Sequence, residues 1–101
     1  MEEKNKSLIQ SDSDYCFIHM TYMGMYVKAV HQHHIFHGTA NRKKADEDGC
    51  YCFLCNYCHA ALHDKGYHDL DLQQLCEKAW LEHYGKTIDD FIERYIRNYL
   101  D

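Results

Sequence analysis

The sequence contains no proline, only five glycines and a single tryptophan, and it has no long apolar run. No stretch approaches the roughly 20 apolar residues that a membrane-spanning helix needs, which excludes a membrane-embedded protein. The first 14 residues, MEEKNKSLIQSDSD, lack the apolar segment of a secretory signal. With 27% charged and 46% hydrophobic residues, the composition is that of a globular domain and not of a disordered chain. We therefore expect a cytoplasmic protein that does not contact a membrane.

An excess of basic charge is also missing. The chain carries 11 Lys and Arg against 16 Asp and Glu, a net charge of -5, which argues against a strongly basic nucleic-acid binder. Nine histidines, and any divalent cation that the protein binds, would offset part of this negative charge. The one basic cluster, Arg42, Lys43 and Lys44, follows the histidine-rich stretch HQHHIFH. This cluster fits either a phosphate-binding segment or a solvated loop.

The small size of the chain limits the core that it can bury. At 101 residues it forms one domain at most, and a bound metal or an oligomer contact would help to stabilise it. In a reducing cytoplasm, the six cysteines are expected to be metal ligands or core residues and not disulfides. We expect a flexible tail over residues 1–13 and a single domain over residues 14–101, without internal repeats.

The middle of the chain predicts a strand, a loop, a second strand and a helix. Residues 26–33, which include VKAVHQH, alternate loosely in polarity and indicate a strand. Residues 37–49, HGTANRKKADEDG, place polar residues between two glycines and indicate a loop. Residues 50–54, CYCFL, are short, aromatic and bounded by turn signals, which favours a second strand. A helix is expected to begin near Asn56.

Residues 69–101 predict two helices that supply the core a small hairpin lacks. The first runs from Asp71, and Gly85 follows it as a stop signal. Thr87 is a good N-cap for the second. The apolar residues at helical spacing are Leu72, Leu75, Cys76, Ala79 and Trp80 in the first helix, and Ile88, Phe91, Ile92, Tyr95, Ile96, Tyr99 and Leu100 in the second. Both stripes are expected to pack in the core, and the tyrosines of the second also suit a dimer contact.

A pair of cysteines at metal-binding spacing stands just before the middle helix. Cys55 and Cys58 form C-x2-C, a spacing at which both thiolates reach one zinc ion. Cys16 and His19 form C-x2-H about forty residues earlier and supply the two further ligands that a tetrahedral ion needs. Such a closed site would join the N-terminal segment to the start of the helix. The alternative is that Cys16 and His19 are a core pair.

The other three cysteines are expected to be core residues. In a strand, Cys50 and Cys52 share one face and point away from Cys55, so a four-cysteine site with Cys55 and Cys58 is disfavoured. Cys76 lies on the apolar face of its predicted helix. All three are interpreted as small buried residues.

Several histidines are spaced to hold a second ion. His59 and His63 lie four residues apart, so a helix presents both from one face. His68 lies just beyond and is a rival to His63. His33 and His34 are adjacent on a strand and point to opposite sides, so one is interpreted as a ligand and the other as a proton-transfer group.

These motifs together resemble a known family. HHIF followed by GTANRKK, then LCNYCH, EHYGK and RNYL, is similar to small HNH-type nuclease proteins of phages and prophages of Gram-positive bacteria. The resemblance covers roughly residues 16–100. It implies an α+β fold in which a zinc-stapled ββα-metal core (residues 14–68) is followed by two packing helices (residues 69–101).

The resemblance also implies roles for individual residues. His34 would be the general base, while His33 and His59 would bind a catalytic divalent cation. The last ligand is either His63, which fits an H-x3-H branch of the family, or His68, which fits the phage branch. Cys16-x2-His19 stands where the family usually has C-x2-C. Two asparagines, Asn41 and Asn56, are candidates for the central asparagine that holds the loop before the second strand by backbone hydrogen bonds.

The implied activity is metal-assisted hydrolysis of phosphodiester bonds in duplex DNA, leaving 5′-phosphate and 3′-hydroxyl ends, inside a bacterial host cell. Imidazole ligands allow Mg²⁺, Mn²⁺, Ni²⁺ or Zn²⁺ as the catalytic ion. Arg42 would stabilise the developing charge, and with Lys43 and Lys44 would hold flanking phosphates. Since one ββα unit cuts one strand, double-strand cleavage would need a homodimer or two events.

The sequence also fits two other interpretations of the protein's function. One is a catalytically inactive, zinc-stapled module that binds DNA or a phage or host protein. The other is a structural protein whose histidines are all satisfied in the core.

Overall fold

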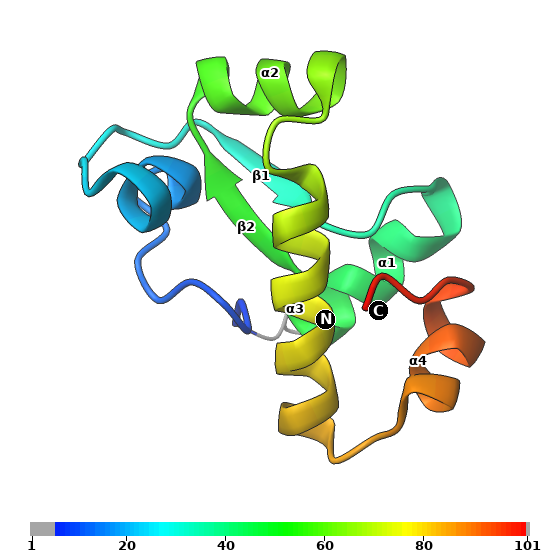
Figure 1. The fold of residues 1–101 in the computed structure, drawn as a ribbon. Helices are drawn as coiled ribbons and strands as arrows, with labels where there is room; N and C mark the ends of the chain where they lie inside the picture. Colours follow the sequence, from blue (N-terminus) through cyan, green and yellow to red (C-terminus); the bar gives the residue numbers. More distant parts are fainter. Residues whose placement is uncertain (1–5, 101) are drawn as a thin grey trace.

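The computed structural model describes residues 6–100. These residues form a small α+β fold with a two-stranded antiparallel sheet and five helices (Figure 1). In chain order the elements are η1 (His19–Met23), β1 (His31–His34), α1 (Thr39–Asp48), β2 (Tyr51–Leu54), α2 (Asn56–Lys65), α3 (Asp69–Tyr84) and α4 (Ile88–Tyr95). Within residues 6–100, no helix combines the length and apolar character that crossing a bilayer requires.

The two strands pair where the second was predicted, but the first begins later than expected. β1 and β2 are antiparallel, with His33 opposite Cys52 and His34 opposite Tyr51. Val27 and Ala29 pair with the N-terminal segment instead: the Cys16 amide donates to the Val27 carbonyl at 2.7 Å, and the Ala29 amide donates to the Asp14 carbonyl at 2.9 Å. The predicted strand over residues 26–33 was therefore wrong in its first half, where the chain is tied to the N-terminal segment.

The segment predicted as a loop is largely helical. α1 begins after Gly38 and ends at Gly49, whose φ of 84° is the left-handed conformation that favours glycine. A Cβ at Gly49 would collide with the Lys6 carbonyl, so only glycine fits there. Ala45 is the one apolar residue that α1 buries; the others it buries are Asn41 and Asp48. Without an apolar stripe, the sequence of α1 offers no helical periodicity to detect.

The buried carboxylate of Asp48 holds the end of α1 against α3 and α4. It accepts hydrogen bonds from Trp80 Nε1 at 2.9 Å, Tyr95 Oη at 2.7 Å and the Arg94 guanidinium at 2.8 Å. A buried charge needs such a set of donors to be tolerated. This network fixes the position of α1 relative to α3 and α4.

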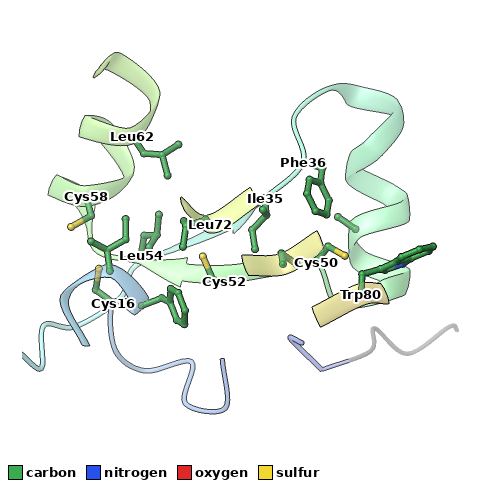
Figure 2. Packing of buried hydrophobic residues seen from close by; sticks show 14 of the residues in the cluster. Cys16, Ile35, Phe36, Cys50, Cys52, Leu54, Cys58, Leu62, Leu72 and Trp80 are labelled. Carbon is green, nitrogen blue, oxygen red and sulfur yellow. The ribbon is translucent and has the colours of Figure 1, made fainter. Parts of the chain in front are cut away.

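The core runs the length of the hairpin between the helices. Figure 2 shows buried side chains extending from Cys58 and Leu62 on α2, past Leu54 and Ile35, to Phe36 and Trp80. Cys50, Cys52 and Cys76 are fully buried, which confirms their prediction as core residues.

The last helix is shorter than predicted. Thr87 caps α4 through a capping box with Asp90, as its sequence indicated. The helix ends at Tyr95, however, because Ile96 adopts a φ of 77°. Tyr99 and Leu100 therefore lie outside the helix, and the Tyr99 amide instead donates to the buried Glu77 carboxylate at 2.7 Å.

The structure describes residues 6–13 of the tail that was predicted over residues 1–13. Residues 6–13 lie along β2, where the Phe53 amide donates to Gln10 Oε1 at 2.7 Å and the Ser7 hydroxyl donates to the Tyr51 carbonyl. Residues 1–5 lie outside the described residues.

Candidate functional site

Four side chains predicted as zinc ligands lie together. The ligand atoms of Cys16, His19, Cys55 and Cys58 are all within 4.8 Å of one another. His19 Nδ1 lies 3.5 Å from Cys55 Sγ and 3.4 Å from Cys58 Sγ. Nitrogen and sulfur ligands of one tetrahedral zinc lie about 3.5 Å apart, given Zn–N near 2.0–2.1 Å and Zn–S near 2.3 Å. The cluster could therefore hold a structural metal such as zinc.

Local structure brings these ligands together. Cys55 is the N-cap residue of α2, and its sulfur accepts a hydrogen bond from the Cys58 amide at 3.4 Å. Although burial alone would raise it, hydrogen bonds from Cys58 lower the pKa of the Cys55 thiol. Burial raises the pKa of the Cys58 thiol. Cys55 therefore favours the thiolate form that a metal needs, whereas the thiolate of Cys58 would be stabilised by a cation bound beside it. The three cysteines are buried, which suits a closed structural site.

A second cluster contains three histidines. His33, His59 and His63 place one ring nitrogen each within 4.8 Å of the others. The Nε2 atoms of His59 and His63 are 3.1 Å apart, a distance that fits either a hydrogen bond or two ligands of one cation, for which about 3.3 Å is expected. The centre of the His33 ring lies 5.4 Å from the centres of the His59 and His63 rings.

His33 is the most unusual member of this cluster. Its side chain is only 2% exposed, and among the residues that the structure describes no group hydrogen-bonds to its Nε2 atom. Leaving a buried polar atom unpaired is costly, and a metal ion bound to this nitrogen would remove that cost. Burial, together with the neighbouring imidazoles, lowers the pKa of His33 to about 3. Burial, followed by the neighbouring His63 and His31, also lowers the pKa of His59, a direction that favours the neutral imidazole that metal ligation requires.

His63 and His68, the rivals for the last ligand position, are placed differently. His63 belongs to the histidine cluster. His68 lies outside it: its Nδ1 is 2.8 Å from Asp71 Oδ2, and its ring stacks on Tyr22 at 4.2 Å. His68 also adopts a φ of 58°, which turns the chain between α2 and α3. The geometry therefore favours His63.

A cavity of about 300 Å³ joins the histidine cluster to other predicted residues. We call it the histidine cavity, and its lining residues are Gln32, His33, His34, Phe36, His37, Gly38, Arg42, His59 and His63. His34, adjacent to His33 but outside the ligand cluster, therefore borders the same space as the three clustered imidazoles. Of the predicted phosphate-binding residues, only Arg42 lines it.

The other two basic residues do not line this cavity. Lys43 is exposed. Lys44 Nζ donates to the Arg94 carbonyl at 2.8 Å and so helps to position α4. Because residues 42–44 lie on a helix and not in a loop, their side chains diverge around its axis.

The two candidate asparagines both lie near the site. Asn41 is buried, and its Nδ2 donates to the His37 carbonyl at 2.9 Å, so it ties the segment after β1 to the start of α1. Asn56 Oδ1 lies 3.1 Å from His31 Nε2 at the edge of the sheet. The backbone hydrogen bond expected of the central asparagine is made by Asn41.

Four residues at or beside the cavity, Gln32, His37, Asp46 and Asp69, were not identified as site residues from the sequence. Asp46 Oδ1 lies 2.8 Å from His34 Nε2 and accepts a 3.3 Å hydrogen bond from Gln32. Asp69 holds His37 Nε2 at 2.9 Å and 3.0 Å through its two oxygens. Recognising residues 39–48 as a helix would have shown Arg42 and Asp46, four apart, on one face.

No protein-family model, curated protein or solved structure matches this chain. The HNH-type assignment of these residues is therefore a proposal.

Proposed function

We propose that the protein is a metal-dependent HNH-type endonuclease that hydrolyses phosphodiester bonds in duplex DNA. The observation that carries the proposal is the buried His33, whose Nε2 has no hydrogen-bond partner among the described residues and whose ring lies beside two further imidazoles in a cavity that His34 and Arg42 also line. A histidine that merely fills a core has its ring nitrogens hydrogen-bonded. This feature argues against the reading in which all histidines are satisfied structural residues.

His33, His59 and His63 would hold the catalytic divalent cation. When bound, such a cation supplies a Lewis acid for the scissile phosphate and its leaving oxygen. Three neutral nitrogen ligands favour Ni²⁺ or Zn²⁺ over Mg²⁺ and Mn²⁺, which prefer oxygen ligands. Three protein ligands also leave coordination positions open, as a catalytic site requires.

His34 is placed to take the proton from an attacking water. A carboxylate only accepts hydrogen bonds, so the contact with Asp46 places a proton on His34 Nε2. In the neutral imidazole this leaves a lone pair on Nδ1, the nitrogen that would act as general base. Arg42, in the same cavity, would hold the phosphate through its guanidinium fork.

Asp46 should matter through the orientation of His34. We expect Asp46→Ala to lower kcat for DNA nicking roughly 10- to 100-fold at nearly unchanged KM, since groups that orient functional histidines typically contribute that much. Steady-state nicking kinetics check this. Glu82→Ala, which removes an equally negative but distant, exposed side chain, should behave like the wild type. A change in KM alone for Asp46→Ala would contradict the orienting role.

The proposal is tested by nicking of supercoiled plasmid with zinc-loaded protein that is stripped of other metals and then given Mg²⁺, Mn²⁺ or Ni²⁺. His63→Ala and His68→Ala form a matched pair, because each removes one imidazole from the end of α2 or the turn after it. We expect His63→Ala to raise the metal concentration for half-maximal nicking by more than about 100-fold, while His68→Ala leaves it unchanged. The reverse pattern would transfer the ligand role to His68.

The second candidate is an inactive zinc-stapled module that binds DNA or a protein. The net charge of -5 favours it, particularly for a basic protein partner. A folded, zinc-loaded protein that cuts with none of these metals would support this reading.

A further inference from the structure

A second cavity, of about 650 Å³, meets the histidine cavity at His37. We call it the C-terminal cleft; among its lining residues are His37, Asn41, Asp69, Gln73, Arg97 and Tyr99. His37 lines both cavities, and its hydrogen-bonded partner Asp69 lines the second. Arg97 and Tyr99 come from the RNYL motif, to which the proposed reaction assigns no role.

The fold presents Arg97 at this cleft in a defined place. Its guanidinium carbon lies 5.3 Å from the centre of the Tyr99 ring, a cation–π distance. Tyr99 is itself anchored: its ring stacks on Phe36 at 5.4 Å, and its backbone hydrogen-bonds to Glu77 and Gln74. Within residues 6–100, no carboxylate forms an ion pair with Arg97. The guanidinium fork thus lies against Tyr99, and among residues 6–100 it has no anionic partner.

The residue before Arg97, Ile96, has a strained backbone conformation. Ile96 has a φ of 77°, which is an outlier for a β-branched residue, and its side chain is 72% exposed. Such conformations persist only where the surroundings hold them, and they gather at functional sites. Here the turn at Ile96 ends α4 and directs residues 97–100 back toward α3 and the cleft.

We propose that the C-terminal cleft binds the DNA strand next to the scissile phosphate and that Arg97 contacts a backbone phosphate there. This inference rests on the proposed nuclease function. A strand whose scissile phosphate lies in the histidine cavity must leave it in two directions, and His37 is the residue that this cavity shares with the cleft. Asp69 lines the cleft too, but its carboxylate is engaged by His37. Arg97 remains the group suited to hold a phosphate oxygen pair.

The test measures binding without cutting. A labelled DNA duplex is titrated with zinc-loaded His34→Ala protein, without added metal, by fluorescence anisotropy over a range of salt concentrations. The double variant His34→Ala/Arg97→Ala should bind the duplex roughly three- to tenfold more weakly than His34→Ala alone. The slope of log K against log salt should also become shallower by about 0.9, the loss expected for one phosphate contact. Arg97→Lys should lie between, since it keeps the charge and loses the fork.

Lys86→Ala is the matched control, because Lys86 is an equally cationic, exposed residue in the turn between α3 and α4. Equal affinity and slope for Arg97→Ala and Lys86→Ala would overturn the cleft proposal, even in a protein that nicks DNA. Binding that depends on Arg97 in a protein that never nicks would support the cleft and contradict the nuclease. A protein that binds no DNA would overturn both.

Discussion

Replacing His34 with alanine is expected to lower kcat for plasmid nicking by about 100- to 10,000-fold, the usual contribution of a general base. The reason is that the variant lacks the Nδ1 lone pair that Asp46 leaves free to accept the proton of the attacking water. The imidazole of His34 lies outside the cluster of His33, His59 and His63, so the variant should bind the second metal as the wild type does. Nicking kinetics at saturating metal measure this effect.

The control for this variant is His83→Ala, which removes an exposed imidazole near the far end of α3. It should nick DNA at the wild-type rate, and both variants should keep their zinc and their melting temperature. Full activity in His34→Ala would remove His34 from the mechanism. Loss of the second metal in that variant would instead make His34 a ligand.

Removing the structural metal should have the largest effect on stability. We expect Cys58→Ala, or chelation of zinc from the wild type, to abolish cooperative unfolding. Structural zinc contributes about 10–16 kcal/mol of apparent binding free energy in small metal-dependent folds, against a typical net stability of about 5–15 kcal/mol for a whole domain. The cluster joins residues 16–19 to α2, and without an ion its buried thiols and imidazole would have no common partner.

Zinc content and thermal unfolding followed by circular dichroism check this prediction. Cys76→Ala is the matched control, because Cys76 is fully buried and lies outside both ligand clusters. It should keep one zinc equivalent and lose only the small stability, on the order of 1 kcal/mol, that a truncated core side chain costs. A Cys58→Ala protein with one zinc and wild-type unfolding would show that the four residues are not a zinc site.

The residues of the two candidate metal clusters were predictable because metal binding depends on short sequence spacings. C-x2-C at the start of a helix and H-x3-H within it bring pairs of ligands together without knowledge of the tertiary fold. The two clusters accordingly contain the residues expected from the sequence. What spacing left open was the choice between His63 and His68, since that depends on where the chain turns after α2.

The partners of those residues were not predictable from the same signals. Asp46 comes from α1, which buries a single apolar residue and is fixed by the hydrogen bonds of Asn41 and Asp48. Hydrophobic periodicity does not predict hydrogen bonds of this kind. The end of α4 was missed for the opposite reason: its apolar pattern continues past Tyr95, yet the chain leaves the helix at Ile96 to hydrogen-bond with Glu77.

In the proposed site, three imidazoles hold a second, exchangeable cation beside a histidine base. The most direct measurement titrates Ni²⁺ or Mn²⁺ into zinc-loaded protein while following both the equivalents bound and the nicking of supercoiled plasmid. We predict one equivalent beyond zinc, bound by the wild type and by His34→Ala alike, with cutting that rises with occupancy in the wild type only. A folded, zinc-loaded wild type that binds no second equivalent, and cuts with none of the metals, would contradict both the second metal site and the proposed nuclease function.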